Sequence, residues 1–367
     1  MTCSLFSRVA TRPSGRARDE ATLPGVGESE STRSGGPDRG GSADSPGVSV
    51  VMPILDEEGH LAEAVRAVLG SAYDGPLQVV LALGPSTDAT DSVAADLAAA
   101  DTRVITVPNP TGRTATALNA AIDAAQHDII VRIDGHAVIP SDYIDTAVRT
   151  LEETGADNVG GIMGAEGVTD FERAVAAAMT SWFGVGGAAF HIGGEPGPAL
   201  TVYLGCFRRS ALERVGGFDE SMVRAQDWEL NHRIRATGGL VWFTPELRVS
   251  YRPRGSLRRL AKQYHEYGRW RREVARRHPE TVSLRYLAPP ITVMAVVGGT
   301  AMGVAGLVTG SRPLLLGFAL PAGYLAANLV ASARAARGLP ASSARWLPAV
   351  FATMHGAWGA GFLRGAR

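Results

Sequence analysis

The chain has 367 residues, and its 36 lysines and arginines are balanced by 36 aspartates and glutamates, so the formal net charge is zero. This length is enough for one large domain or for two. The neutral balance gives no reason to expect a nucleic-acid partner. The two cysteines, Cys3 and Cys206, lie far apart in the sequence. They do not make a disulfide framework, which favours a reducing compartment.

Residues 1–47 are rich in Ser, Gly, Arg, Asp and Pro. They lack hydrophobic periodicity, and they lack the apolar core of a signal peptide. We predict a disordered N-terminal tail over these residues. The alternative is a start codon assigned too far upstream, in which case the tail is not part of the protein.

From residue 48 the sequence alternates between strand and helix patterns. Strands are predicted over residues 48–55, 77–83, 103–107 and 128–133. Helices are predicted over residues 58–70, 88–100 and 114–126, because apolar side chains recur there on one face. This alternation predicts an α/β fold with a doubly wound, mainly parallel sheet. Ligands bind such sheets outside the carboxyl ends of the strands. Four acidic residues follow those ends: Asp56, Glu57, Asp88 and Asp134.

The motif Asp134-Gly135-His136 ends the last of these strands. A carboxylate at the tip of a buried strand, with an imidazole two residues later, can hold a divalent cation against a diphosphate. Oxygen and imidazole ligands suit Mg²⁺ or Mn²⁺. Aspartate at a strand end is also a common turn residue, so the motif alone is compatible with a plain turn.

The last third of the chain begins with a basic block. Between Arg252 and Arg285 there are eleven lysines and arginines against three glutamates. We predict a basic juxtamembrane helix over residues 256–283 that meets anionic lipid head groups. The positive-inside rule places this block, and the part of the chain before it, on the cytoplasmic side of the cell membrane.

Residues 284–367 predict a membrane region with two or three hydrophobic segments. The stretches 284–308 and 314–333 are long enough, at about 1.5 Å per residue, to cross a hydrocarbon core of ~30 Å. The stretch 347–363 is shorter and carries His355. Since Arg364 and Arg367 disagree with a third full crossing, this segment is expected to be re-entrant or interfacial. Buried core helices are the alternative for all three segments.

Six stretches carry a family resemblance through their order and spacing. They are Pro53-Ile54-Leu55-Asp56-Glu57-Glu58, Ser86-Thr87-Asp88-Ala89-Thr90, Asn109-Pro110-Thr111-Gly112-Arg113 with Leu118-Asn119, Arg132-Ile133-Asp134-Gly135-His136-Ala137, Gly216-Gly217-Phe218-Asp219-Glu220 and Gln226-Asp227-Trp228-Glu229-Leu230-Asn231. Together they resemble family 2 glycosyltransferases with the A-type nucleotide-sugar fold, and within that family the bacterial succinoglycan-type enzymes. The stretch 354–359 also resembles this subgroup.

The resemblance implies a glycosyltransferase (a hexosyltransferase) that uses a nucleotide-sugar donor and a divalent metal, Mn²⁺ or Mg²⁺. It implies metal ligation by Asp134 and His136. It assigns donor binding to seven residues: Pro53, Asp56, Glu57, Asp88, Arg113, Asn119 and Asp134. It assigns the general base to Asp227, at the start of a predicted helix, where capping the helix is the alternative role. Glu229 is the second choice for the base.

Two departures from the family pattern affect the donor. Many members have a second aspartate where this chain has His136, so the metal site loses one negative charge. Many also have an acidic residue that reaches the nucleotide base, where this chain has Leu83 and Gly84. A UDP-sugar is favoured as the donor, but the nucleotide stays open.

A further resemblance concerns three residues of the basic block. Gln263, Arg269 and Trp270 are similar to a Gln…Arg-Trp motif of processive relatives, although the spacing here is longer. Together with Glu229, they are possible contacts to the acceptor or the diphosphate.

Three functions are compatible with these patterns. The leading one is a membrane-anchored inverting glycosyltransferase with a lipid-linked or polysaccharide acceptor, as in exopolysaccharide or cell-envelope glycan synthesis. The second is a polyprenyl-phosphate sugar synthase, whose phosphate acceptor needs no strong base. The third is an inactive nucleotide-sugar-binding membrane scaffold. Membrane lipids are expected partners in each case.

Overall fold

The structure is a computed structural model, and it describes residues 45–365. The predicted tail over residues 1–47 lies outside the described residues except for its last three.

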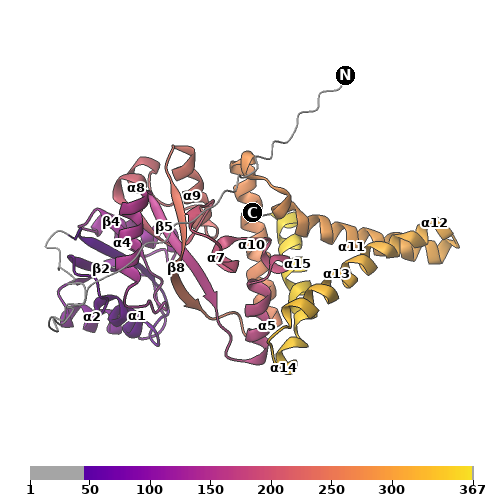
Figure 1. Cartoon of the computed structure of the whole chain (residues 1–367), viewed down its shortest axis with the longest axis horizontal. Coiled ribbons are helices and arrows are strands. Elements are labelled where there is room, and N and C mark those ends of the chain that lie inside the picture. The colour runs from indigo at the N-terminus through magenta and orange to yellow at the C-terminus, as the bar shows by residue number, and fades with distance from the viewer. Residues whose placement is uncertain (1–44, 366–367) are drawn as a thin grey trace, which may run out of the picture. The chain divides into compact units, whose positions relative to one another are not determined.

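The central element of the described chain is one eight-stranded sheet (Figure 1). Its strands are β1 (Val48–Ile54), β2 (Leu77–Leu83), β3 (Val104–Pro108), β4 (Ile129–Arg132), β5 (Asn158–Ala165), β6 (Gly197–Pro198), β7 (Tyr203–Arg208) and β8 (Val241–Tyr251). Their order is β3-β2-β1-β4-β7-β5-β8-β6. The first four strands confirm the predicted elements to within about two residues.

Six of the eight strands run in one direction, so the sheet is mainly parallel, as predicted, but not entirely so. Strands β3, β2, β1 and β4 are parallel neighbours, but β7 is antiparallel to both β4 and β5. The sheet is therefore mixed. Strand β5 approaches β8 very closely at a register shift, where a Cβ on Gly161 would overlap the carbonyl of Leu247. Such long-range pairing is set by contacts that a local sequence pattern does not contain.

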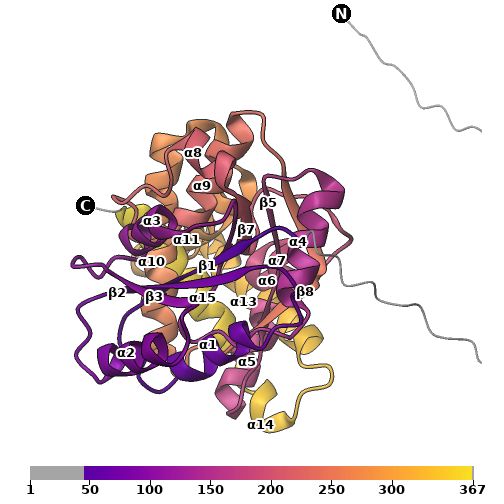
Figure 2. The same cartoon turned by 90° about the vertical axis from the view of Figure 1, so that its left-hand side faces the viewer.

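Helices cover both faces of the sheet, as the predicted doubly wound fold requires. One core packs α1 (Leu61–Leu69), α2 (Thr90–Ala100) and α4 (Tyr143–Thr154) on one face. The other core packs α3 (Thr114–Ala124), α8 (Arg209–Val215) and α9 (Gln226–Ala236) on the opposite face. Figure 2 shows α1 and α2 on the side of β1–β3 that is opposite to α3. Each fully buried Leu or Val contributes about 1.5–3 kcal/mol, and this burial fixes where the strand ends lie.

The basic block forms one long helix, α10 (Leu257–Arg277), followed by the short turn η1 (Pro279–Thr281). Helix α15 (Leu347–Arg364) packs along α10 so closely that a Cβ on Gly268 would overlap the carbonyl of Trp358. With α5 (Asp170–Met179) these helices share a third core that includes Tyr264, Phe351 and Met354. The third hydrophobic segment is thus packed against protein.

Between α10 and α15 the chain forms α11 (Leu284–Thr309), α12 (Arg312–Leu315), η2 (Leu316–Phe318), α13 (Ala319–Ala335) and α14 (Ala341–Ala344). Within the described residues, two helices are long and apolar enough to cross a membrane: Leu284–Thr309 with 26 residues and Arg312–Ala335 with 24. Only 17% and 11% of their apolar windows are buried. Helices α11 and α13 lie side by side (Figure 1), and Gly299 and Gly303 of α11 contact the segment around Phe318.

Candidate active site

A cleft of about 1080 Å³ opens at the carboxyl ends of the central strands. The loops after β1, β4 and β8 line it together with the segment before α9. Its lining includes Pro53, Glu57, Asp134 and His136 from the predicted site. Five arginines also line it: Arg132, Arg224, Arg252, Arg254 and Arg259. A concave site with this many guanidinium groups favours an anionic ligand. One guanidinium group can donate two parallel hydrogen bonds to the oxygens of a phosphate or carboxylate.

Arg132 joins the two carboxylates that the sequence singles out. Its Nε and Nη2 donate to Oδ1 of Asp134 at 3.1 and 3.0 Å, and its Nη1 donates to Oδ1 of Asp227. The arginine is only 7% exposed. Burial alone would lower the pKa of its guanidinium, but the charges of the two carboxylates outweigh burial and raise it. The buried guanidinium of Arg132 thus binds both Asp134, after the end of β4, and Asp227, at the start of α9.

No role for Arg132 was predicted from the sequence. A signal was present, because this is the one charged residue inside the buried strand Ile129–Arg132. Burying a charge costs several kcal/mol unless it is paired, so an arginine in an apolar strand predicts carboxylate partners. The identity of the second partner, Asp227, depends on the tertiary fold.

His136 is hydrogen-bonded to Glu57, with 2.7 Å between Nδ1 and Oε1. The hydrogen bond to Glu57 raises the pKa of His136, and partial burial of the ring opposes that shift. Gly135 makes the pair possible, since a Cβ there would lie 2.8 Å from Ile54 and 3.2 Å from the Glu57 side chain. The donor set of Asp134, His136 and Glu57 has the oxygen and imidazole chemistry of an Mn²⁺ site. Their ligand atoms are not gathered as tightly as those of a second cluster of the described chain, His232, His278 and Glu280.

Asp56 and Asp88 link the loops after β1 and β2 and do not line the cleft. Asp56, with a φ of 54°, accepts a 2.7 Å hydrogen bond from the amide of Thr87. Asp88 accepts from the amide of Glu58 at 3.2 Å, and its hydrogen bond from the Thr90 hydroxyl lowers its pKa. Both side chains hold the cleft wall in place.

The remaining two residues predicted to bind the nucleotide-sugar donor, Arg113 and Asn119, also lie outside the lining of the cleft. Asn119 holds the Gly216–Glu220 motif, since it donates to the carbonyl of Phe218 at 2.9 Å and accepts from the Phe218 amide at 2.8 Å. Arg113 is exposed, and its neighbour Thr114 reaches the cleft.

Helix α9 begins beside the cleft. Its N-cap is Ala225, a left-handed residue with a φ of 61°, and Asp227 lies in the first turn. The Asp227 side chain contacts Arg132 and is 43% exposed. The alternative role in capping therefore does not match the observed contacts. An acidic side chain in the first turn is favourable beside the positive end of the helix dipole.

Glu229 faces away from Asp227. It is 3% exposed, binds Nε and Nη2 of Arg233 at 2.7 Å, and lies 3.3 Å from Nε2 of His278. Arg269 binds Glu266 at 2.9 Å and the carbonyl of Gly365 at 3.0 Å, and neither it nor Trp270 lines a cavity described here. The structure does not bring these three residues to the cleft.

Gln263 connects the cleft to a second cavity of about 610 Å³. Its amide nitrogen donates to the hydroxyl of Tyr251, which lines the cleft, at 2.8 Å, and to that of Tyr267, which lines the second cavity, at 2.9 Å. The second cavity is walled mainly by apolar side chains of α6 (Trp182–Val185), α10, α11, α13 and α15. The apolar second cavity thus lies next to the polar, arginine-rich cleft.

The comparisons with known proteins agree on one family. The profile of Glycosyl transferase family 2 matches residues 49–216. The Succinoglycan biosynthesis protein ExoA of Rhizobium meliloti (strain 1021) is 33% identical over 257 residues, which cover 70% of this chain and 78% of that protein. A second relative is the dolichyl N-acetyl-α-D-glucosaminyl phosphate 3-β-D-2,3-diacetamido-2,3-dideoxy-β-D-glucuronosyltransferase of Methanococcus voltae. It is 24% identical, and the match covers 60% of this chain and 71% of that protein.

Among solved structures, the mannosyltransferase PcManGT of Pyrobaculum calidifontis, in complex with GDP-Man and Mn²⁺, matches with a TM-score of 0.54. It is 21% identical, and the match covers 88% of this chain and 87% of that one. This likeness supports the A-type fold that the sequence motifs predicted. The identity to the succinoglycan protein, over most of both chains, shows the family: the chain is a glycosyltransferase and belongs to glycosyl transferase family 2.

Proposed function

We propose that the chain is a membrane-anchored, inverting glycosyltransferase that moves a sugar from a nucleotide-sugar donor, a UDP-sugar, to a lipid-linked or polysaccharide acceptor in glycan synthesis. The observation that carries this proposal is the bridge from Asp134 through Arg132 to Asp227. It joins a metal-competent carboxylate that lines the cleft to a carboxylate suited to general-base catalysis, Asp227, which does not line the cleft itself but follows the lining residue Gln226.

The proposed reaction gives roles to five residues of the cleft and to Asp227. Asp134 and His136 would hold Mn²⁺ or Mg²⁺, and a bound ion would supply charge neutralisation for the diphosphate leaving group. Arg252, Arg254 and Arg259 line the cleft, where their guanidinium groups would contact phosphate oxygens. Asp227 accepts the proton of the acceptor hydroxyl as that oxygen attacks the anomeric carbon.

The proposed acceptor rests on the second cavity. The apolar second cavity begins at Tyr267, which Gln263 links by hydrogen bonds to Tyr251 of the cleft. A lipid chain can therefore lie in the second cavity while its polar head reaches the cleft. The relative from Methanococcus voltae carries a dolichyl-linked sugar phosphate in its name, and the Rhizobium relative is named for succinoglycan biosynthesis. Both support an envelope or exopolysaccharide glycan as the product.

The proposed arrangement divides the chain into a catalytic part over residues 48–255, a basic juxtamembrane helix over residues 256–283 and a membrane region over residues 284–367. The two apolar helices of that region anchor the enzyme. The eleven basic residues between Arg252 and Arg285 favour a cytoplasmic catalytic part.

The test uses the full-length protein in detergent with Mn²⁺ and a panel of UDP- and GDP-sugars. Thermal shift identifies the donor, and release of nucleoside diphosphate is then measured with and without lipid extract from the source membrane. Donor binding and lipid-dependent release are expected. Binding without any release, with every donor and acceptor fraction, would support the inactive scaffold instead. Transfer to a bare polyprenyl phosphate would favour the sugar synthase.

A further inference from the structure

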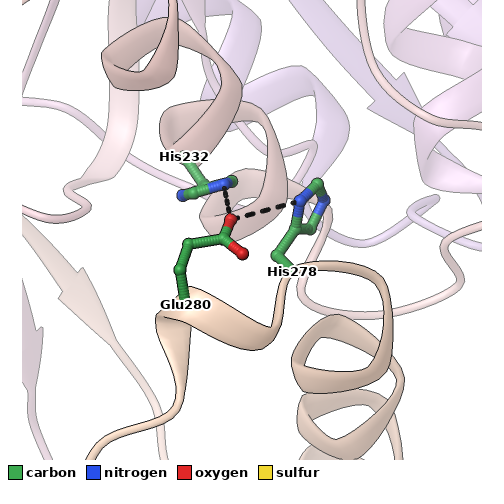
Figure 3. Close-up of side chains that lie close together, drawn as sticks. All are labelled: His232, His278 and Glu280. Atoms are coloured by element: carbon green, nitrogen blue, oxygen red, sulfur yellow. Dashed lines mark ion pairs between the residues drawn. The ribbon is translucent and has the colours of Figure 1, made fainter.

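Three metal-competent side chains converge away from the cleft, where α9 meets the end of α10. They are His232 of α9, His278 at the C-cap of α10 and Glu280 of η1 (Figure 3). One ligand atom from each lies within 4.8 Å of the others. We propose that these residues form a binding site for a transition-metal ion, best suited to Zn²⁺, that links the helix carrying Asp227 to the segment entering α11.

The distances in the cluster suit a small ion. Nε2 of His232 lies 2.8 Å from Oε1 of Glu280, and Nδ1 of His278 lies 3.8 Å from the same oxygen. Zinc binds histidine nitrogen and carboxylate oxygen at about 2.0–2.2 Å, and a tetrahedral arrangement at that radius separates neighbouring ligand atoms by about 3.3 Å. These two distances lie on either side of that value and the remaining pair of ligand atoms lies within 4.8 Å, so the side chains would have to shift for all three atoms to reach one ion.

The surroundings of His278 have the form expected around a metal ligand. Its second nitrogen, Nε2, lies 3.3 Å from the carboxylate of Glu229, which is buried and also paired with Arg233. Metal-bound histidines commonly donate their other N–H to a carboxylate, which fixes the ring and its tautomer. Glu229 therefore leaves Nδ1 of His278 free to face the cluster.

His232 is also held in place. Its ring stacks on Trp228 with 5.7 Å between centroids and 7° between planes. Two imidazoles and one carboxylate select Zn²⁺ over Mg²⁺ or Ca²⁺, since the latter prefer oxygen ligands.

The site has an open side. The side chains of His232 and His278 are 12% and 22% exposed, whereas Glu280 is 61% exposed. Three protein ligands with solvent access leave a fourth position for water. The ion would cross-link segments that are distant in sequence, and this role does not depend on the proposed transfer reaction.

The test uses the full-length protein in detergent, purified without a polyhistidine tag and treated with a chelator. Excess Mg²⁺ is kept present to occupy oxygen-rich sites. Zn²⁺ binding is measured by calorimetry and by the thermal unfolding midpoint, and Co²⁺ is then used as a spectroscopic probe. We expect one Zn²⁺ per chain, a raised midpoint and the intense visible absorption of tetrahedral Co²⁺.

Variants assign the site. His232→Gln and His278→Gln should remove the Co²⁺ absorption, and Glu229→Gln should weaken Zn²⁺ binding about 10–100-fold. Glu280→Gln is compared with Glu153→Gln, because Glu153 is similarly exposed at 62% but lies outside the cluster. Absence of Zn²⁺ and Co²⁺ binding by the unaltered chain would overturn the proposal. Binding that survives in His232→Gln but disappears in Asp134→Asn would overturn it as well, since the ion would then occupy the cleft.

Discussion

Arg132 contacts Asp227, a residue 95 positions later in the chain, while the same guanidinium binds Asp134 two positions after it. The end of β4 and the start of α9 therefore share one buried cation. Because the arginine fork fixes the direction of each contact, the separation of the two carboxylates is set by the scaffold. In the proposed reaction, that separation determines whether a donor diphosphate and an acceptor hydroxyl can be held in line.

Arg132→Lys tests this positioning. Lysine keeps the charge but has no planar fork, so it cannot hold both carboxylates in the same geometry. We expect the turnover number to fall by about 10²-fold, as displacements near 1 Å can cause, with a smaller change in the Michaelis constant of the donor. Steady-state transfer kinetics measure both. Arg149→Lys, at an exposed ion pair, is the control and should have normal kinetics. A loss of stability with normal turnover would limit Arg132 to a structural role.

Asp134→Ala tests the proposed metal and donor site. The variant should fold, because Asp134 is only partly buried and lies after the end of β4. A ligand at ~100 times its dissociation constant adds ~2.7 kcal/mol of stability, so Mn²⁺ with the donor should raise the unfolding midpoint of the unaltered protein and not of the variant. Asp128→Ala, with a 97% exposed side chain at the other end of the strand, should behave as the unaltered protein does. Unchanged metal-dependent binding by Asp134→Ala would contradict the assignment.

The two apolar helices predict a topology. Ser343 donates a 2.8 Å hydrogen bond to Asp170 of α5, so the chain after α13 returns to the catalytic part. Cysteine placed at Ser342 should therefore react only after the membrane is permeabilised. Cysteine placed at Ser311, between α11 and α12, should react in intact cells. A Cys3→Ser background leaves Cys206, which is buried. Equal labelling of both positions in intact cells would exclude two crossings.

His191 predicts a dependence of stability on pH. Burial, together with the charge of Arg285, lowers the pKa of His191 to about 3. Its unfolded value is about 6.5, so below that pH the unfolded chain binds a proton that the folded chain does not. The folded state is then penalised progressively from about pH 6.5 towards pH 3, and there is no penalty at higher pH.

The comparison of variants isolates this effect. The unfolding midpoint of the unaltered protein should fall more between about pH 7 and about pH 4 than that of His191→Gln, which has no group to protonate. His60→Gln, at an exposed histidine, should follow the unaltered protein. Parallel curves for the unaltered protein and His191→Gln would show that the folded state accommodates the charge.

Local patterns predicted the first half of the fold well. Strands β1 to β4 and the start of α9 lie where hydrophobic periodicity and motif spacing placed them. The antiparallel strand β7, the packing of α15 along α10 and the pairing of Arg132 with Asp227 were not predicted. Each depends on contacts between segments far apart in the sequence. Such contacts produce no periodic pattern of apolar residues in the local sequence.

The candidate active site was likewise predicted only in part. Glu57, Asp134 and His136 line the cleft because strand ends meet at one edge of a sheet. Asp56, Asp88 and Asn119 belong to the same motifs but hold loops together instead. A motif identifies residues that occur together, whereas the direction of each side chain depends on packing around it.

Asp227→Asn tests the proposed general base. Asparagine keeps the size of the side chain, and α9 needs no side-chain cap from this position, so the fold should survive. The variant loses the proton acceptor, and removal of a general base typically costs about 10²–10⁴-fold in rate. Donor affinity should change little, because the proposed metal ligands lie elsewhere. Glu229→Gln tests the second choice for the base, and near-normal transfer is expected because the Glu229 carboxylate is buried against Arg233.

The outcomes separate the remaining alternatives. Near-normal transfer by Asp227→Asn to a hydroxyl acceptor would remove Asp227 from the base role, and a strong loss in Glu229→Gln would transfer that role to Glu229. Near-normal transfer to a polyprenyl phosphate alone would favour the sugar synthase, whose acceptor carries its own negative charge. Loss of donor binding in Asp227→Asn would place this carboxylate in the donor site. Arg132 could explain that last result, because a guanidinium released from Asp227 is free to draw Asp134 away from the metal.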